Sequence, residues 1–380
     1  MDYKFTEEQE LLMASMTEIM QSENWEPYFA ECDANNVFPD KFYRVLRDAG
    51  LFHLLLPESC GGMGGEMVTF AAAWEALLRN GGCAAPIWTV EYMLEALRDG
   101  TQEQRKILWD VFEKGDNVPL CAAYTEPSGG SDLGSLQTSY TRKNGKIYIN
   151  GQKTFITDAR EASYALLLTR DAETGEKYTM WLAPLKNKSG IKIVPMHGKL
   201  GLRTNSCCEM FFDDYELEEK DMLGTEGKGF DQLKIDFNLE RLIQPIYHYG
   251  LAFCAYEDAV KYANQREAFG KTIGRFQLMQ LKIANMSSKL AAMRSLVYES
   301  CWKFDKNLLG REDAGICKFF CLDAAFSIID DAMQIMGGIA VASENRIARA
   351  WRDVRCDRMA GGSTEMMVIA IAKSVLKRYK

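Results

Sequence analysis

The sequence predicts an α+β protein in which a helical region, a β region and a second helical region follow one another. Three observations lead to this prediction. Apolar residues recur at helical spacing up to about residue 117, and again from about residue 230 to the end. Between them, short alternating or apolar runs are separated by turn residues, which is typical of an antiparallel β domain. We therefore expect three domains, at residues 1–117, 118–229 and 230–380.

Composition narrows the functional classes. The chain has 380 residues, of which 47% are hydrophobic and 26% charged, as in ordinary soluble globular proteins. Its net charge of −8 argues against nucleic acid or an anionic membrane as the main partner, although a phosphorylated ligand needs only a local basic pocket. No secretory signal and no apolar run of membrane-spanning length are visible, so we expect a cytoplasmic protein without membrane insertion.

Cysteine and histidine usage predicts no metal site. The eleven cysteines are scattered and only three histidines occur, and none of these residues has the spacing of zinc ligands. Reduced thiols in a cytosolic protein explain this pattern better than a disulfide framework does.

The first region begins with a helix signal. Thr6 to Gln9 forms a capping box, and apolar residues follow at helical spacing. A second helix is expected from Pro39 to Gly50, with proline at its start and glycine past its end. Further helices are expected at Met67–Leu78, Glu91–Leu97 and Thr101–Glu113, the last opened by another capping box.

The middle region contains a hairpin signal. Strands near Thr138–Arg142 and Ile147–Ile149 flank the turn pair Asn144-Gly145. Other strands are expected at Tyr164–Thr169, Tyr178–Ala183, Ile191–Val194 and Glu209–Phe212, with Asn150-Gly151 and Ser189-Gly190 among the turns between strands.

Long amphipathic helices with short loops fill the last region and predict an antiparallel four-helix bundle. They are expected at about Phe230–Gln265, Gly274–Asp305, Glu312–Met336, Arg346–Arg352 and Thr364–Lys380.

The stretch from Tyr124 to Asp158 carries the clearest functional signal. Its first part, Thr125-Glu126-Pro127-Ser128-Gly129-Gly130-Ser131-Asp132, is a Gly/Ser-rich loop whose N–H groups and hydroxyls could hold a flat, anionic ligand. Its last part places an aromatic ring, Phe155, two residues before the hydroxyl of Thr157. A planar heterocycle could stack one face on this ring and form a hydrogen bond with this hydroxyl. Taken alone, such a loop is more often just a turn.

The string Thr-Glu-Pro-x-x-Gly-Ser-Asp, followed by an aromatic-Ile-Thr, resembles the flavin-binding signature of the acyl-CoA dehydrogenase family. The resemblance covers nearly the whole chain and implies that family's three-domain fold with bound FAD. It implies that Ser131 also lies near the thioester substrate, and that Phe155 stands where the family usually has a tryptophan stacked on the flavin. The cofactor residues implied in this stretch are Tyr124, Thr125, Ser131, Phe155, Ile156 and Thr157.

Two further motifs resemble the family's cofactor contacts. Arg266-Glu267-Ala268-Phe269-Gly270-Lys271, with the nearby Gln277, resembles the motif whose arginine and phenylalanine meet the cofactor of a neighbouring subunit, which implies a homotetramer. Gln334-Ile335-Met336-Gly337-Gly338 resembles the motif at the adenosine end. The residues that follow Gly338 depart from the family's usual continuation. The implied cofactor residues here are Arg266, Phe269, Gln277, Gln334, Gly337 and Gly338.

The catalytic base is the main departure. Most family members carry Glu-Gly-Thr where this chain has Gly361-Gly362-Ser363, and that glutamate removes the substrate's α-proton. A minority branch, which includes isovaleryl-CoA and long-chain acyl-CoA dehydrogenases, has its glutamate just before the arginine that corresponds to Arg241. The resemblance therefore implies Glu240 as the base, while a helix-surface glutamate is the ordinary alternative.

The resemblance also implies roles for the residues close to Glu240 and Gly361 in the sequence. Gly361 would offer its backbone N–H to the thioester carbonyl. Ser363 and Glu365 would face the cofactor, and Asn238, Arg241 and Gly362 the substrate.

The implied reaction is α,β-desaturation of an acyl-CoA thioester or its reverse, with an electron-transfer flavoprotein as redox partner. Within the family, Lys199–Arg203 and Asn205–Glu209, together with Gly361-Gly362-Ser363, look closest to crotonobetainyl-CoA reductases. Two alternatives remain open: a homologue that binds flavin but has lost catalysis, which Gly361 favours, and a flavin-dependent oxidase of the same fold.

Overall fold

The computed structural model describes residues 4–115 and 118–380. Its N-terminal part is helical, as predicted, and the capping boxes at Thr6 and Thr101 both form. The helix α2 was not predicted; its Pro27 lies in the first turn, where a proline costs no helical hydrogen bond. The helices are α1 (Glu7–Ser22), α2 (Trp25–Asn35), α3 (Asp40–Asp48), α4 (Met67–Arg79), α5 (Trp88–Asp99) and α6 (Gln102–Lys114).

The middle part is one sheet, which has seven strands within the described residues, in the order β1-β4-β2-β3-β7-β6 with β5 also paired to β4. The strands are β1 (Leu120–Ala123), β2 (Ser139–Lys143), β3 (Lys146–Thr157), β4 (Tyr164–Asp171), β5 (Tyr178–Pro184), β6 (Ile191–Pro195) and β7 (Cys207–Leu217). Most pairings are antiparallel, as predicted. The pairings of β4 with β1 and with β2 are parallel, which the sequence pattern did not indicate.

The predicted hairpin is confirmed. Strands β2 and β3 pair antiparallel around Asn144 and Gly145, whose φ angles of 55° and 72° are those of a tight hairpin turn. The predicted turn at Asn150-Gly151 is wrong, because β3 continues through both residues to Thr157. Gly151 is needed inside the strand: a Cβ there would lie 2.6 Å from Cα of Thr138.

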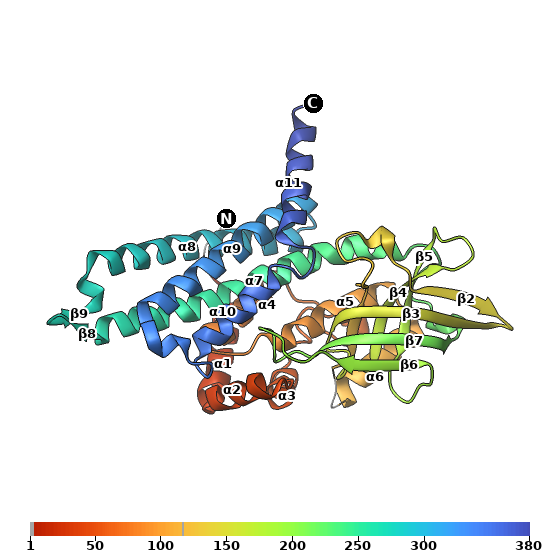
Figure 1. The fold of residues 1–380 in the computed structure, drawn as a ribbon, viewed down its shortest axis with the longest axis horizontal. Helices are drawn as coiled ribbons and strands as arrows, with labels where there is room; N and C mark the ends of the chain where they lie inside the picture. The colour runs from red at the N-terminus through yellow and green to blue at the C-terminus, as the bar shows by residue number, and fades with distance from the viewer. Residues whose placement is uncertain (1–3, 116–117) are drawn as a thin grey trace.

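The C-terminal part is a helix bundle formed by α7 (Gly229–Gln265), α8 (Gln277–Asp305), α9 (Arg311–Met336), α10 (Arg346–Asp357) and α11 (Thr364–Arg378). Helices α7, α8 and α9 lie side by side, and α11 contacts α9 before it extends away from the body (Figure 1). The segment Arg311–Val341 is apolar and long enough to cross a membrane by length and composition alone, with a mean hydropathy of 1.3. It contacts α7, α8, α10 and α11, which makes it the central helix of the bundle.

Two hydrophobic cores hold these parts together. The larger one joins the N-terminal helices to the bundle and reaches one face of the sheet through residues such as Leu166 and Met180. The smaller one, which includes Trp181 and Tyr215, lies within the β domain. The predicted boundary between residues 117 and 118 adjoins residues 116 and 117, which lie outside the described part, and the boundary at 229–230 falls at the start of α7.

Candidate active site

A buried ion pair fastens the Gly/Ser-rich loop to β3. Lys153 and Glu126 are both buried, and Nζ of Lys153 lies 2.8 Å from Oε1 of Glu126. The same ammonium donates to the carbonyl oxygen of Tyr124 at 3.0 Å, and the carboxylate accepts from the backbone N–H groups of Gln137 and Thr138. The loop is therefore held rigidly beside the strand.

Phe155 sits on an irregularity in β3. The register between β3 and β7 shifts between Lys153 and Ile156, as at a β-bulge, and bulges redirect side chains. Phe155 adopts a φ of 58° and leaves 61% of its surface exposed. A left-handed conformation is unusual for a bulky residue and costs on the order of 1–3 kcal/mol. An exposed aromatic ring held at such a cost indicates a functional position.

Glu240 lies on α7 next to Gly361, which belongs to the loop that joins α10 to α11. Gly361 has a φ of 61°, and a Cβ at this position would lie 2.5 Å from Cδ of Glu240 and closer still to Oε1. The carboxylate of Glu240 therefore occupies the space that a side chain at residue 361 would need. Glycine at this position leaves room for that carboxylate.

Lys318 on α9 holds this loop from below. Its side chain is fully buried, and Nζ donates to the carbonyl oxygens of Ala360, Gly361 and Gly362 at 2.7, 2.9 and 2.9 Å. These three bonds use all three protons of an ammonium group. The backbone N–H of Gly361 has no acceptor within the described residues and is left available to a ligand.

Burial and charge act in opposite directions on Glu240. Desolvation raises the pKa of its carboxyl, whereas the positive charges of Lys318 and Arg241 lower it, and the balance is a raised pKa. The pKa of Lys318 falls to about 8, because burial disfavours its charged form more than the nearby carboxylate of Glu240 supports it. A carboxylate with a raised pKa is suited to accept and return a proton near neutral pH.

The residues expected to face the substrate lie around this carboxylate. Arg241 is buried, and its Nε has no hydrogen-bond partner among the residues that the structure describes. A Cβ on Gly362 would lie 3.9 Å from the guanidinium of Arg241. The side-chain oxygen of Asn238, two residues before Glu240 on α7, is buried and likewise has no partner in the described part of the chain. Ser363 and Glu365 lie at the start of α11, where Ser363 is the N-cap residue and Glu365 is exposed.

Helix α5 connects this site with the end of β3. Burial raises the pKa of the Tyr92 phenol on α5, and the nearby carboxyls, Glu91 first and then Glu240 and Asp158, raise it further. Asp158 follows Thr157, the last residue of β3. The hydroxyl of Tyr124 donates to Glu95 on α5 at 3.0 Å. Helix α5 therefore packs against α7 and β1, and Glu95 holds Tyr124 at the start of the flavin-type stretch.

The other predicted cofactor residues lie elsewhere. Arg266 and Phe269 belong to the β8 (Glu267–Ala268) and β9 (Lys271–Thr272) hairpin, at the end of the molecule opposite the sheet (Figure 1). Phe269, at the tip of this hairpin, is 94% exposed with a φ of 52°. Gln277 begins α8 beside it, and Gln334, Gly337 and Gly338 lie at the end of α9.

The residues of the second and third motifs lie too far from the residues around Glu240 to contact the same part of one bound cofactor within one chain. Lys318 and Gln334 are on one helix, and 16 residues at 1.5 Å each separate them by about 24 Å. A single chain therefore presents the ring-side residues at one end and the residues of the second and third motifs at the other.

Sequence reasoning missed Lys318 and Lys153. Each is a single lysine inside a helix or strand pattern, where a solvated surface charge is the usual outcome. Lys153 stands two residues before Phe155 and could have been recognised as the partner of Glu126 only from the fold. The signal for Lys318 is its apolar setting, Cys317-Lys318-Phe319-Phe320, which is unusual for an exposed lysine.

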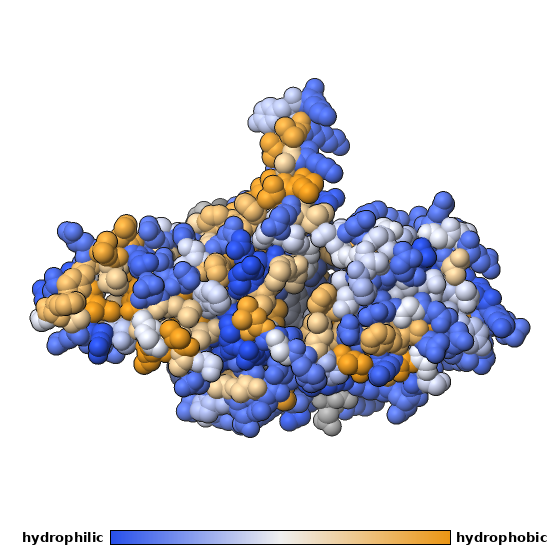
Figure 2. Space-filling view, viewed as in Figure 1, coloured by the Kyte–Doolittle hydropathy of each residue, from blue (hydrophilic) through white to orange (hydrophobic). Residues whose placement is uncertain are grey.

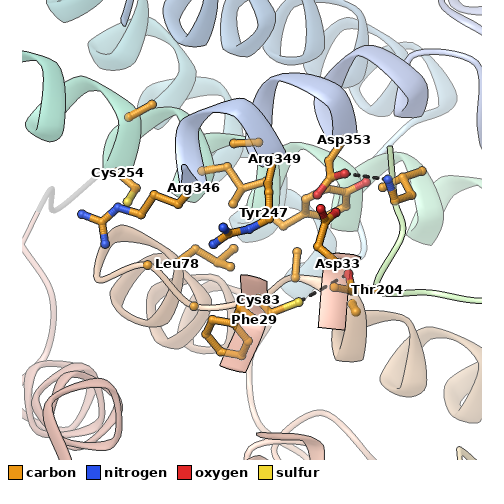
Figure 3. Close-up of a pocket in the computed structure, with 18 of the residues that line it drawn as sticks. Phe29, Asp33, Leu78, Cys83, Thr204, Tyr247, Cys254, Arg346, Arg349 and Asp353 are labelled. Carbon is orange, nitrogen blue, oxygen red and sulfur yellow. Dashed lines mark hydrogen bonds between the residues drawn. The ribbon is translucent and has the colours of Figure 1, made fainter. Parts of the chain in front are cut away.

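A small cavity lies apart from this site. It measures about 70 Å³ and lies among α2, α4, α7, α10 and the loop at residues 202–205. Figure 3 shows Arg346 and Arg349 from α10 beside Tyr247 and Cys254 from α7. Both arginines are paired, with Asp258 and Glu26 respectively. Its volume is well below that of ordinary ligand pockets, so the cavity suits a few waters.

Comparisons with known proteins give one consistent result. Family models described as the N-terminal, middle and C-terminal domains of acyl-CoA dehydrogenase match residues 6–111, 121–215 and 227–376. Glutaryl-coenzyme A dehydrogenase in its glutaryl-CoA complex is 26% identical, with 99% of this chain and 97% of that chain covered and a TM-score of 0.92.

Two further solved structures are similar over the whole chain. Butyryl-CoA dehydrogenase from Megasphaera elsdenii is 26% identical, with 99% and 100% of the two chains covered and a TM-score of 0.90. A chain of a structure described as the electron transferring flavoprotein of Acidaminococcus fermentans is 28% identical, with 99% and 100% covered and a TM-score of 0.92.

Proposed function

Because the chain belongs to the acyl-CoA dehydrogenase family and is an oxidoreductase of that type, we propose that it interconverts an acyl-CoA and its trans-2-enoyl-CoA. One observation carries the proposal: the carboxylate of Glu240 occupies the space of the missing side chain at Gly361. This supports a base supplied from α7, and favours an active enzyme over a homologue that has lost catalysis.

FAD is the proposed cofactor, and the residues present fit it. Phe155 offers an exposed ring beside the half-buried Thr157, and the loop from Thr125 to Ser131 is fastened next to them. Bound FAD would accept a hydride from the substrate's β-carbon, or return it in the reverse direction. Arg266 and Phe269, at the opposite end of the chain, would hold the cofactor of a neighbouring subunit in a homotetramer.

The chain's own residues supply proton transfer and stabilisation of charge. Glu240 removes the α-proton in the oxidative direction and returns it in the reductive one. The free N–H of Gly361 donates to the thioester carbonyl oxygen, where negative charge develops as the α-proton leaves. Lys318 fixes this N–H by holding the three carbonyl oxygens of the same loop.

The tetramer and its partners are part of the proposal. The exposed apolar side of α11, which includes Val368, Ile369 and Leu376, projects from the body and suits contact with another subunit (Figure 2). An electron-transfer flavoprotein is the proposed redox partner in a cytoplasmic setting. Crotonobetainyl-CoA, reduced to γ-butyrobetainyl-CoA, is the proposed substrate, on the likeness of residues Lys199–Arg203 and Asn205–Glu209 to reductases of that type.

The test is anaerobic titration of the purified flavoprotein with a panel of acyl-CoA thioesters, followed by the visible absorbance of the flavin. We expect bleaching by at least one saturated thioester, and reoxidation of the reduced enzyme by the matching enoyl-CoA. Complete absence of both would show that the protein is an inactive flavin-binding homologue. Release of hydrogen peroxide in air at the rate of turnover would identify an oxidase instead.

A further inference from the structure

Helix α7 carries a row of polar side chains that begins at the candidate base. Glu240, Gln244 and His248 follow one another at intervals of four residues, so they lie along one side of the helix. Gln244 and His248 are completely buried. Buried polar side chains are uncommon and need partners, so a row of them behind a candidate base calls for an explanation.

Asp357 meets this row from α10, of which it is the last residue. The hydroxyl of Tyr247 donates a hydrogen bond to Oδ2 of Asp357, and Nε2 of His248 lies 3.5 Å from the same oxygen. Asp357 also stands four residues before Gly361 in the chain. Burial first, and then the charge of Glu240, raise the pKa of Asp357 well above its ordinary range, so this carboxyl holds a proton at neutral pH.

The neighbours of Asp357 are neutral and incompletely bonded. Nδ1 of His248 lies 2.8 Å from the backbone carbonyl oxygen of Gln244, which can only accept, so Nδ1 carries the ring proton. Burial lowers the pKa of His248 to about 3, which leaves Nε2 as an acceptor. Within the described residues, neither Nε2 of His248 nor either polar atom of the Gln244 side chain has a hydrogen-bond partner. Ordered water satisfies buried groups of this kind.

Tyr247 connects Asp357 with the small cavity among α2, α4, α7 and α10, because it also lines that cavity (Figure 3). The cavity is partly open, and its volume of about 70 Å³ suits a few waters. Asp353, one helical turn before Asp357 on α10, lines it too, and burial raises the pKa of this carboxyl to about 6. Tyr247 therefore has a protonated carboxyl on one side and a space for water with a titratable carboxyl on the other.

A base at the position of Glu240 needs a route for its proton. While a thioester covers the site, a proton taken from the α-carbon can only return to that carbon or leave through the protein. Lys318 offers no route, since its three protons are all bonded to carbonyl oxygens of the loop. The row on α7 leads away from the site toward Asp357 and Tyr247.

We propose that Gln244, Asp357 and Tyr247 form a proton relay that connects Glu240 with water in the cavity while a thioester is bound. This inference rests on the proposed function and goes beyond it to the way in which the base is reset. The proton on Glu240 passes, through water beside the Gln244 amide, to one carboxyl oxygen of Asp357.

The later steps restore every group of the relay. The proton that Asp357 already holds leaves from its other oxygen to the hydroxyl oxygen of Tyr247, and the hydroxyl proton of Tyr247 passes to water in the cavity. The net change is one proton moved from Glu240 to solvent, and the reductive direction runs the same steps backwards. His248 does not trap the proton, because its pKa is too low.

The experiment measures hydrogen exchange at the α-carbon in heavy water on the FAD-loaded enzyme. The probes are acyl-CoA thioesters in which sulfur replaces the β-carbon, so that no hydride can leave and only the α-proton moves. Mass spectrometry gives the rate of deuterium uptake, and displacement by a second thioester gives the rate of dissociation. We expect exchange to be faster than dissociation, because the proton leaves Glu240 while the thioester is still bound.

Variants assign this exchange to the relay. In Tyr247→Phe and Asp357→Asn, tested separately, exchange should slow by about tenfold or more. The long-wavelength absorbance of an enolate beside oxidised flavin should remain, since Glu240 still removes the α-proton; a merely structural defect would reduce it as well. Tyr298→Phe is the control: Tyr298 likewise donates its hydroxyl to a buried carboxyl, that of Glu75 on α4, and its replacement should leave exchange unchanged.

The outcomes separate the two proposals. Exchange no faster than dissociation in the unmodified enzyme, or exchange that neither variant slows, overturns the relay and leaves the dehydrogenase function standing. Absence of exchange, of enolate absorbance and of flavin bleaching with every thioester overturns the function itself. If one variant does not fold, the other decides, together with the comparison of exchange and dissociation in the unmodified enzyme.

Discussion

Replacing Glu240 with glutamine is the most direct test of the site. The amide keeps the volume of the carboxylate, which fills the space above Gly361, but it cannot accept the α-proton. The three atoms nearest to a Cβ placed on Gly361 belong to Glu240 and Lys318, so Glu240 is the carboxylate closest to this space. Glu365 is exposed at the start of α11, and Asp357 is engaged by Tyr247. The rate of α-proton removal should therefore fall by about 100-fold or more.

The assay is stopped-flow bleaching of the flavin by saturated thioester, with thioester binding measured separately. Since the carboxylate of Glu240 supports the charged form of Lys318, its removal lowers the pKa of Lys318 further below 8. Measurements well below pH 8 keep that ammonium charged and the loop held. Flavin content and thioester affinity should stay near those of the unmodified enzyme. Near-normal bleaching would refute the reasoning and place the base elsewhere.

Three further predictions use other parts of the structure. Gly361→Ala should displace the carboxylate beside it and lower activity on the order of 100-fold; Gly175→Ala, where φ is also positive but nothing lies within 4 Å, should cost only the backbone strain of about 1–2 kcal/mol in stability. Lys153→Met should reduce the free energy of unfolding by about 3–5 kcal/mol and lower flavin content, because it leaves a buried carboxylate unpaired. Lys146→Met breaks an exposed pair on the same strand and should leave the free energy of unfolding nearly unchanged; both are measured by chemical denaturation. Because the pKa of Glu240 is raised and the base must be deprotonated, the rate of flavin bleaching should rise with pH through that pKa, and the enoyl-CoA reaction should fall; a pH profile of the unmodified enzyme without that limb would contradict this.

Local signals predicted most of the fold, and its exceptions have physical causes. Capping boxes and the Asn144-Gly145 turn satisfy backbone groups within a few residues, so they are legible in the sequence. The length of β3 cannot be predicted in the same way, because Gly151 looks like a turn residue in the sequence. Glycine is needed there because Thr138, which directly precedes β2, approaches it closely. Parallel pairing of β1 with β4 likewise depends on contacts between distant residues.

The candidate site was predicted less completely than the fold. The exchange of Gly361 and Glu240 followed from a resemblance, and their contact depends on how α7 and the loop before α11 pack together. Lys318, which holds that loop, is a single lysine inside a helical pattern, and its burial depends on the same packing.

The glycine at 361 changes what the loop must do. Gly361 and Gly362 have φ angles of 61° and 79°, and such a pair has more conformational freedom to lose than any other residues would. An N–H that stabilises charge must nevertheless stay in place, or the advantage of preorganisation is lost. Lys318 resolves this by holding three successive carbonyl oxygens from a fully buried position, which fixes the loop without any side chain on it. The proton-transfer group can then stand on α7, a rigid helix. On the proposed mechanism, catalysis would need the loop only for its backbone, and the missing glutamate at 361 would be a relocation of the base.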